Sequence, residues 1–525
     1  GVAIFIKGQE SKGTLTDLDG NFSITISSAE DILVFTYVGM ERQEIRVGNQ
    51  EDLKVVLKSS ATELEEVVIE GGYGLMHKRS DMVGSAFQLK GDKITNLPAS
   101  RLDEMLTGLI PGMQVEYNSN DAQARPRMNV RIRGEGATNL ASSEPLWIID
   151  GVRLDTGGHT NLVAGVETSV SPLSYLDPNE VESITVLKDP VMTTLYGADA
   201  SNGVILITTK TGNERTPTLN IRTRFGVSSI DKGTRFKVLD GPQFMMLAKE
   251  SYKNTYGDLV DFPFQDNDVN IYKGVNTDWS KVYFQSALTT DIGVSVRGGG
   301  KKSNYFLSAG YYDAESTLKG DDKTRFSVRG NVSTKIKDWI QLQYRSGFSY
   351  NTDNVFNVGR NYLEEVPIFT PYNDDDTFRM FYKVKEQGGW KSYRFNNRVA
   401  EREQNTHKQR SVFATNHLEL TLDLMKGLKT TTSGGLNYTS RHEEIYKSRE
   451  NWSGKKLTPP YEGIGYSYRN STNQMSWVFN QRVNYNQRFD KHTVSGLLGL
   501  ELLSNTTRGV RAQGSGFPND QILEI

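Results

Sequence analysis

The 525-residue chain contains no cysteine at all. This excludes structural disulfides, thiolate metal sites and a thiol nucleophile, and it leaves the redox compartment undecided. Long hydrophobic runs are missing as well, since no stretch approaches the roughly eighteen apolar residues of a transmembrane helix. A membrane role stays open, because the strands of a transmembrane β-barrel need only about ten alternating residues each.

An excess of either charge is also missing. The 61 basic and 63 acidic residues give a formal net charge of -2, which argues against a nucleic-acid binder that acts by neutralising phosphates. The length exceeds the usual size of one domain, so several domains are expected. The 24 Tyr, 22 Phe and 6 Trp fit a membrane barrel with aromatic girdles, although soluble β proteins are aromatic too.

Catalytic and metal-binding motifs are incomplete. The six histidines are scattered: His77, His159, His407, His417, His442 and His492. The string after His442 lacks the second His of a zinc-protease helix, and Gly298–Ser303 lacks the spacing of a phosphate-binding loop. Asp17–Asn21 fits a hairpin turn better than a calcium loop, and Asp374–Asp376 fits a solvated acidic turn. We therefore expect no enzyme, no metal and no cofactor.

The passage from Asn129 to Gly212 carries the clearest pattern of secondary structure. Its β-branched runs predict strands at Val130–Ile132, Trp147–Ile149 and Val204–Thr209. Residues 179–186 and 191–196 predict a further strand and a short helix. Small residues between 198 and 203 indicate a tight turn.

This passage reads VRIRG, PLWIIDGV, LDPNEVESITVLKD and TTLYGADASNGVILITTKTG. The ordered string closely resembles the plug domain of SusC/RagA-like TonB-dependent outer-membrane transporters. LDEMLTGLIPGMQV, upstream, matches the same pattern and predicts a short amphipathic helix over Leu102–Leu109, with Ser100 as its cap. We place the plug at residues 75–212.

Residues 1–58 predict a small all-β module. Its apolar residues alternate at period two: Ile4, Ile6, Phe22, Ile24, Ile26, Leu33, Phe35, Tyr37, Leu53, Val55 and Leu57. The segment resembles the carboxypeptidase-regulatory-like β-sandwich that precedes the plug in this family, without its first strand. Nothing catalytic is implied by that name.

Residues 59–74, SSATELEEVVIEGGYG, form a linker with an acidic cluster, a β-branched run and a glycine-rich exit. The linker resembles the TonB box of the family. The resemblance implies that the residues which bind TonB are Leu64, Glu65, Glu66, Val67, Val68 and Ile69. A mobile segment of this kind can add as a strand to a sheet edge of a partner. The alternative is an ordinary strand that links two domains.

Residues 213–525 predict the first part of an antiparallel transmembrane β-barrel. Spans of about ten residues alternate between apolar and polar side chains, for instance around Tyr305–Tyr311, Leu342–Tyr350 and Leu418–Leu424. Long polar inserts are expected at 231–281, 351–409 and 441–471. The fold class is thus mainly β: a small sandwich, an α+β plug and a partial barrel.

The resemblance implies TonB-dependent active import of oligosaccharides or oligopeptides across the outer membrane of a Gram-negative bacterium. The implied partners are a SusD-like surface lipoprotein that closes the barrel as a lid, TonB of the TonB-ExbB-ExbD complex, and outer-membrane lipid. No nucleic acid is expected. Nothing in the sequence chooses between a glycan and a peptide, or identifies substrate-contacting residues.

Two alternatives remain open at this stage. A non-transporting surface glycan-binding or adhesion β protein would need neither plug nor TonB box. A signal-transducing TonB-dependent receptor would carry an additional N-terminal signalling module. The chain opens within an apolar alternating run and offers about nine or ten candidate spans, too few for a plugged barrel of about 22 strands. We therefore expect a preceding segment and further barrel strands in the native protein.

Overall fold

The structure is a computed structural model of the chain. It describes residues 1–525 except 1, 18, 38–39, 41, 49–51, 58–67, 71–75, 79–85, 96–101, 118–127, 133–143, 155–171, 215, 231–236, 265–273, 357–364, 387–388, 457–459, 461, 491 and 522–525. Two compact units are formed, Gly1–Glu70 with Leu75–Met82, and Gly71–Gly74 with Val83–Ile525.

The first unit contains a four-stranded antiparallel sheet in the order β2-β1-β3-β4. Its strands are β1 (Ala3–Ile6), β2 (Gln9–Leu15), β3 (Ile32–Thr36) and β4 (Gln43–Arg46). The strands predicted around residues 22–26 and 53–57 are not formed, although their apolar side chains do pack against the core of Ile4, Ile6, Leu33 and Phe35. Alternation reports which side chains face the core, whereas a strand also needs a partner that accepts its hydrogen bonds.

The second unit begins with the plug. Its mixed sheet has the order β11-β10-β13-β12-β7, and β10 and β13 are parallel. The strands are β7 (Ala86–Lys90), β10 (Leu146–Ile149), β11 (Val152–Leu154), β12 (Val181–Leu187) and β13 (Val204–Thr209), and β8 (Met113–Tyr117) pairs separately with β9 (Met128–Ile132). The strands predicted in this passage are therefore present.

Short helices complete the plug: α1 (Gly91–Thr95), α2 (Leu102–Met105), α3 (Pro190–Thr193), and 3-10 turns at Pro172–Tyr175, Pro178–Glu180, Thr194–Tyr196 and Ala198–Ala200. The predicted helix at 191–196 corresponds to α3 and the turn after it. The helix predicted over Leu102–Leu109 is shorter than expected, because turns replace it after Met105. Its proposed cap, Ser100, lies outside the described residues.

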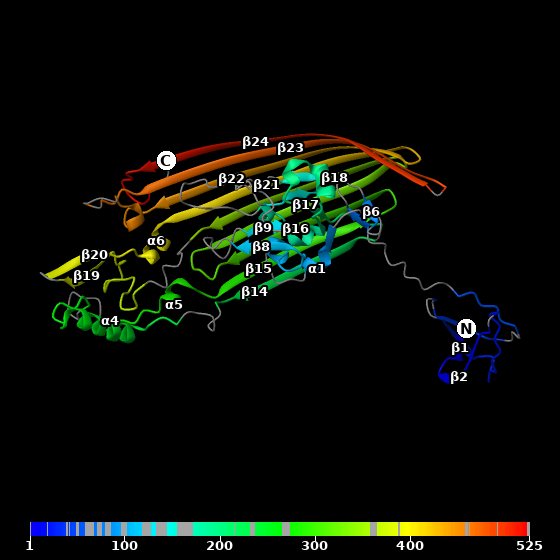
Figure 1. Cartoon of the computed structure of the whole chain (residues 1–525), viewed down its shortest axis with the longest axis horizontal. Coiled ribbons are helices and arrows are strands. Elements are labelled where there is room, and N and C mark those ends of the chain that lie inside the picture. Colours follow the sequence, from blue (N-terminus) through cyan, green and yellow to red (C-terminus); the bar gives the residue numbers. More distant parts are fainter. Residues whose placement is uncertain are drawn as a thin grey trace. The chain divides into compact units, whose positions relative to one another are not determined.

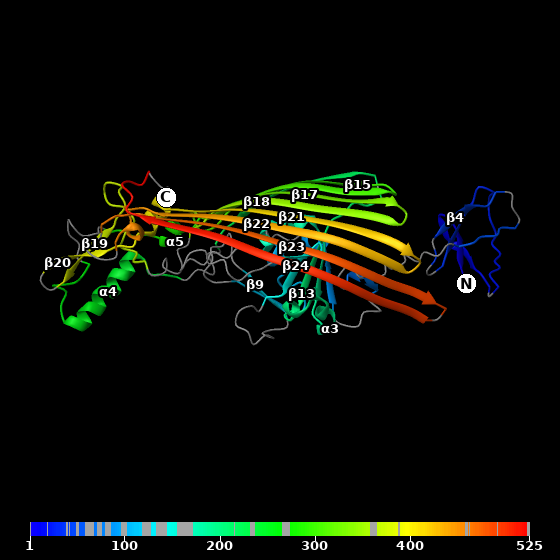
Figure 2. The ribbon, with the colours of Figure 1, turned by 90° about the horizontal axis from the view of Figure 1, so that it is seen from above.

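The remainder of the second unit is dominated by a nine-stranded antiparallel sheet, here called the wall, in the order β14-β15-β16-β17-β18-β21-β22-β23-β24. Its strands are β14 (Thr218–Ser228), β15 (Ala287–Gly299), β16 (Ser303–Glu315), β17 (Asp322–Lys337), β18 (Ile340–Asn354), β21 (Thr406–Met425), β22 (Leu428–Lys447), β23 (Tyr466–Phe489) and β24 (His492–Ser515). The wall curves, and the plug lies against its concave face (Figures 1 and 2). Among the described strands, the edges β14 and β24 do not pair with each other, as expected for a partial barrel.

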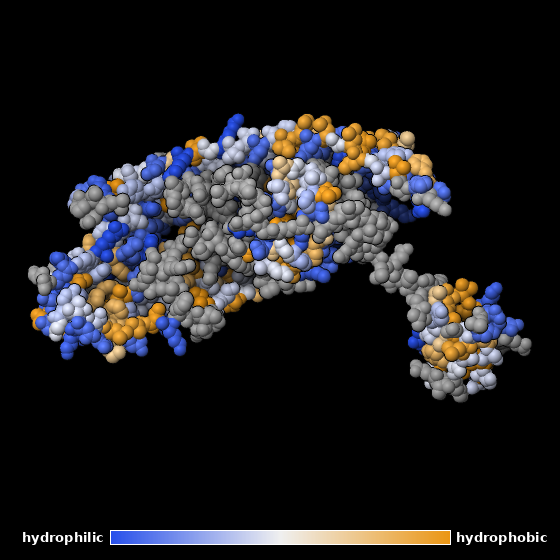
Figure 3. All heavy atoms as spheres, in the orientation of Figure 1, coloured by the Kyte–Doolittle hydropathy of each residue, from blue (hydrophilic) through white to orange (hydrophobic). Residues whose placement is uncertain are grey.

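The two faces of the wall differ in polarity because side chains alternate along each strand. One outward row crosses eight strands by register: Ile221, Val294, Ala309, Val328, Phe348, Ala414, Tyr438 and Met475. The neighbouring inward row is polar and small: Ser295, Ser308, Arg329, Gly347, Thr415 and Asn437. Exposed apolar residues of β24 form an orange band along the rim in Figure 3. An apolar outer face and a polar inner face are typical of an outer-membrane barrel.

The long inserts are more ordered than the sequence indicated. They contain α4 (Gly241–Tyr256), α5 (Trp279–Tyr283), the hairpin β19 (Phe381–Glu386) and β20 (Gly389–Arg394), and α6 (Arg398–Gln404), all gathered at one end of the wall (Figure 1). A shared core that includes Phe262, Trp279, Phe369 and Phe395 holds them together. No helix in the described residues is long and apolar enough to cross a membrane.

The insert predicted at 441–471 is too long. Residues up to Lys447 belong to β22, and residues from Tyr466 belong to β23. Both strands exceed the expected ten residues and reach a region where polar side chains occupy both faces. The apolar alternation that reveals a membrane strand is absent there, so the sequence reads as a loop.

Candidate functional site

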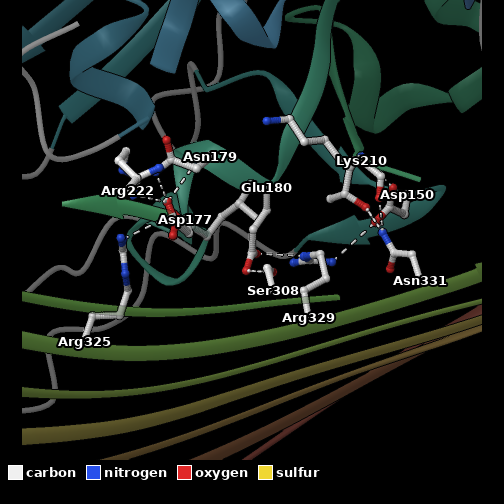
Figure 4. A network of polar contacts seen from close by, with 12 residues as sticks. Asp150, Asp177, Asn179, Glu180, Lys210, Arg222, Ser308, Arg325, Arg329 and Asn331 are labelled. Atoms are coloured by element: carbon white, nitrogen blue, oxygen red, sulfur yellow. Dashed lines mark hydrogen bonds and ion pairs between the residues drawn. The ribbon is translucent and has the colours of Figure 1, made fainter. Parts of the chain in front are cut away.

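The contact between plug and wall is centred on a buried ion pair. Glu180 closes the 3-10 turn Pro178–Glu180, which begins at the capping residue Asp177. Its Oε2 accepts a hydrogen bond from Nε of Arg329 on β17 at 2.8 Å, and its Oε1 accepts from the Ser308 hydroxyl at 2.8 Å. Figure 4 shows the pair and its contacts. Both charged side chains are about 5% exposed or less, so the pair is shielded from water.

Asp150 connects the same arginine to a second part of the plug, the turn that joins β10 to β11. It follows β10 in a left-handed conformation, with φ of 50°, and opens the turn into β11. Its carboxylate accepts hydrogen bonds from the backbone N–H and the hydroxyl of Thr209 at 2.9 and 2.7 Å. The guanidinium groups of Arg329 and Arg345 lie 3.6 and 3.5 Å from its oxygens. Asp150 is thus both a structural turn residue and a partner of the wall.

A third carboxylate extends the network toward the edge of the wall. One Nη of Arg222 lies 3.9 Å from Oδ1 of Asp177 and 3.0 Å from Oδ1 of Asp291. Arg325 donates to the backbone carbonyl of Leu176 at 3.3 Å. Plug carboxylates therefore face wall arginines along β14, β17 and β18.

Glycines of the wall make room for these contacts. A Cβ at Gly347 would lie 2.8 Å from an Nη of Arg329 and 3.0 Å from Oγ1 of Thr415. A Cβ at Gly435 would lie 2.4 Å from Cγ2 of Val152 in the plug. Real Cβ atoms do not approach so closely, so the arginine can cross β18, and the plug can approach β22, only because side chains are missing there.

An aromatic pair adds an apolar contact. The rings of Tyr175 in the plug and Phe413 on β21 stack with centroids 4.9 Å apart, and Phe413 belongs to the hydrophobic core of the plug. Arg441 donates from Nε to the Tyr175 hydroxyl at 3.0 Å. Because one wall residue completes the plug core, the two parts pack as one body.

The charged residues Glu180, Asp150, Arg329 and Arg345, here called the latch, join the plug to the wall. Its charges are paired, and in the described part of the chain no three His, Cys, Asp or Glu residues are placed to hold a metal ion. At the acidic turn, Asp375 accepts hydrogen bonds from the backbone N–H and hydroxyl of Thr377, as a turn-capping residue does. Removing one partner of a buried ion pair costs about 3–5 kcal/mol, so the latch contributes substantially to holding the plug on the wall.

The predicted TonB box is only partly covered. Leu64, Glu65, Glu66 and Val67 lie outside the described residues. Val68 and Ile69 belong to β5 (Val68–Glu70), which pairs antiparallel with β6 (Met76–Lys78). The role of these residues stays a prediction.

The sequence did not single out the residues of the latch. Asp150 and Glu180 lie in the strings PLWIIDGV and LDPNEVE that carry the family resemblance, but they read there as turn residues. Arg329 and Arg345 read as ordinary polar positions of alternating strands. Only the folded position of β17 and β18 opposite the plug shows that these arginines contact Glu180 and Asp150.

Comparison with known proteins agrees with this architecture. Residues 78–204 match the TonB-dependent Receptor Plug Domain family, and residues 1–69 match the CarboxypepD_reg-like domain family. The chain is 33% identical to TonB-dependent receptor SusC of Bacteroides thetaiotaomicron over 385 residues, 72% of this chain and 35% of that protein. It is 27% identical to TonB-dependent receptor P3 of Formosa agariphila over 545 residues, 99% of this chain and 48% of that protein.

A solved structure shares the fold. The RagAB peptide importer in its open-open state superposes with a TM-score of 0.68 at 23% identity, and the match covers 87% of this chain and 51% of that one. The chain thus spans about half the length, or less, of the proteins that it matches.

Proposed function

We propose that this chain, which belongs to the SusC/RagA-like TonB-dependent transporters, serves the active import of oligosaccharides or oligopeptides across the outer membrane of a Gram-negative bacterium. The observation that carries the proposal is the plug seated on the concave face of the wall and held by Glu180 and Arg329. A seated plug blocks passage, so import requires that a force loosen this contact. A non-transporting adhesion protein would need no such plug.

The proposed entry point for the force is the TonB box, Leu64 to Ile69. Strand addition to TonB requires an extended backbone with available N–H and C=O groups. Val68–Glu70 is already extended in the β5–β6 hairpin, and TonB would pair with β5 at its other edge or in place of β6. The acidic residues Glu65 and Glu66 would keep the segment solvated until then.

The proposed outer partner is a SusD-like lipoprotein that closes the barrel as a lid. The ordered inserts with α4, α5, α6 and the β19–β20 hairpin offer a preformed platform at one end of the wall. Purification of the native protein in mild detergent should yield a stable complex with such a lipoprotein. Repeated isolation without any lipoprotein would contradict this partner.

The experiment that tests the function separates binding from uptake. Val68→Pro removes a backbone donor and so should weaken strand addition, whereas Val68→Thr keeps the donor and the β-branch and serves as the control. Ligand affinity of the purified protein should be unchanged in both variants. Growth on the cognate substrate should fail for Val68→Pro and for deletion of residues 64–70. Normal growth of both would show that the box is misplaced or that import is not driven by TonB.

A further inference from the structure

A buried tryptophan organises the turn between β22 and β23. Trp452 begins a 3-10 turn that Asn451 caps, and its indole Nε1 donates to the backbone carbonyl of Met380 at 2.9 Å. The side chain is only 3% exposed. This hydrogen bond ties the turn to the residue that precedes β19, so the two inserts form one surface.

Two cations converge on this ring. The guanidinium carbon of Arg394, at the end of β20, lies 4.5 Å from the Trp452 ring centroid, and the Nζ of Lys455 lies 4.8 Å from it. Phe381, the register partner of Arg394, meets the ring edge-on with centroids 5.0 Å apart. Cation–π attraction to the indole ring therefore helps to hold both charged groups in place.

The neighbouring cations are neutralised, but these two are not. Lys391 pairs with Glu386 in the same hairpin, and Lys456 pairs with Glu462 in the same loop. Within the described residues, no carboxylate lies within ion-pair distance of Arg394 or Lys455, and each of the two cations lies over the Trp452 ring. Partial burial, together with the charge of Arg394, lowers the pKa of Lys455. The two like charges therefore repel each other, and a bound anion would offset that repulsion.

The turn that contains Trp452 is linked by hydrogen bonds to the start of β21. Asn451 donates to the side chain of Asn405 at 2.7 Å, directly before β21. Two residues further on, His407 contacts Glu443 at 2.8 Å, and Glu443 is wholly buried. Glu443 lies on the same inward face of β22 as Asn437 and Thr439, because side chains alternate along the strand. Trp452 directly follows Asn451, so the ring that carries the two cations adjoins the place where the polar inner face of the wall meets the inserts.

We propose that Arg394 and Lys455 form a subsite for an acidic group, a carboxylate or a sulfate ester, carried by the imported oligomer. That the oligomer is imported rests on the proposed function, whereas binding of an anion by Arg394 and Lys455 does not depend on it. Guanidinium and ammonium donors make charge-assisted hydrogen bonds to such oxygens. The continuity with the inner face favours a soluble oligomer on its way inward over the phosphate of an outer-leaflet lipid.

The first test locates an anion directly. Crystals of the native full-length protein are soaked in selenate, whose selenium scatters anomalously, and Arg394→Gln/Lys455→Gln is compared with Lys456→Gln as the matched control. We expect a selenium peak beside Arg394 and Lys455 in the wild type and in Lys456→Gln, and no peak in the double variant. Absence of the wild-type peak overturns the proposal.

The second test asks what carries the anion. Binding of a galacturonic acid hexamer is measured against neutral maltohexaose, together with the phosphate content of lipid co-purified with each variant. The double variant should bind the acidic hexamer at least about tenfold more weakly, with unchanged maltohexaose binding and lipid content. Equal hexamer affinity in both proteins means an adventitious ion only, and loss of bound lipid phosphate alone assigns the pair to the membrane. Either result overturns the proposal.

The two proposals fail in different ways. Cells that import normally without residues 64–70 refute the proposed TonB box, or TonB-driven import itself, but leave the selenium peak and the hexamer affinity intact. A missing peak refutes the subsite but leaves the growth defect of Val68→Pro intact.

Discussion

Arg329 on the wall and Glu180 in the plug share a hydrogen bond of 2.8 Å, with both side chains about 5% exposed or less. A second plug carboxylate, Asp150, lies 3.6 Å from the same guanidinium. One arginine thus joins two separate turns of the plug to the wall. Its removal leaves two carboxylates without their shared counter-charge.

We expect Arg329→Gln to destabilise the docked plug by about 3–5 kcal/mol, because it leaves the buried Glu180 without its counter-charge. Glu180→Gln should cost less, because Asp150 still faces Arg329 at 3.6 Å. The apolar double variant Arg329→Met/Glu180→Met should recover a large part of that loss. Hydrogen exchange of plug peptides around β12, followed by mass spectrometry, measures the effect. Additive losses in the double variant would argue against a direct pairing.

Gly347→Ala should disturb the same contact without changing a charge. The added Cβ would lie 2.8 Å from an Nη of Arg329, so the guanidinium must leave its place between Glu180 and Asp150. Gly434→Ala is the matched control, since nothing lies within 4 Å of a Cβ at Gly434 on the neighbouring part of the wall. Hydrogen exchange at β12 should rise for Gly347→Ala and stay constant for Gly434→Ala. Equal hydrogen exchange at β12 in the two variants would mean that Arg329 can accommodate the added Cβ without losing its contacts.

The outward row predicts a depth-dependent penalty for a charge. Val328→Lys places an ammonium in the middle of the apolar face and should cost about 2–4 kcal/mol. Ile336→Lys changes an exposed residue at the irregularity near the end of β17, close to the turn, and should cost about 0–1 kcal/mol. Urea-induced unfolding in lipid vesicles measures both. A similar cost at the two positions would show that Val328 does not face lipid.

The first unit offers a pH test at Asp17. Hydrogen bonds from the backbone of Asn21 and its neighbours hold the pKa of this carboxyl below its usual range. A lowered pKa stabilises the fold above the unfolded value of about 4, and this contribution is lost as the pH falls through the folded pKa. Asp17→Asn should therefore reduce protection of the turn at neutral pH and flatten its acid dependence, while Asp19→Asn should not. Hydrogen exchange of peptides that span residues 9–26, corrected for intrinsic rates, checks both variants.

The sequence predicted the outer face of the wall better than its inner face. Val328 and Phe348 alternate with polar residues, and hydrophobic alternation reports directly on a lipid-facing strand. Arg329 gives no such signal, because an arginine between apolar residues looks the same whether it meets water or a plug carboxylate. Its role depends on a partner 149 positions away, which local pattern cannot register.

Edge strands and ordered inserts were missed for related reasons. β2 reads QESKGTL, a polar string whose pairing with β1 is backbone-driven. The inserts were read as loops, although Asp240 and Gln243 form a capping box at the start of α4, a local signal that the sequence did carry. Their shared aromatic core is a tertiary property and had no sequence pattern of its own.

The separation between the latch residues bears on the order of folding. Glu180 and Arg329 are 149 positions apart. A further plug–wall ion pair, between Arg153 on β11 and Glu501 on β24, joins residues that are 348 positions apart. Each wall strand, in contrast, pairs mostly with its immediate successor. Contacts between distant positions form late, because the entropy of closing a long loop opposes them until other structure brings the ends together. The wall hairpins are therefore expected to assemble first and the plug to settle last. A folding intermediate between these two stages would have a formed wall whose inward arginines are not yet paired with the carboxylates of the plug.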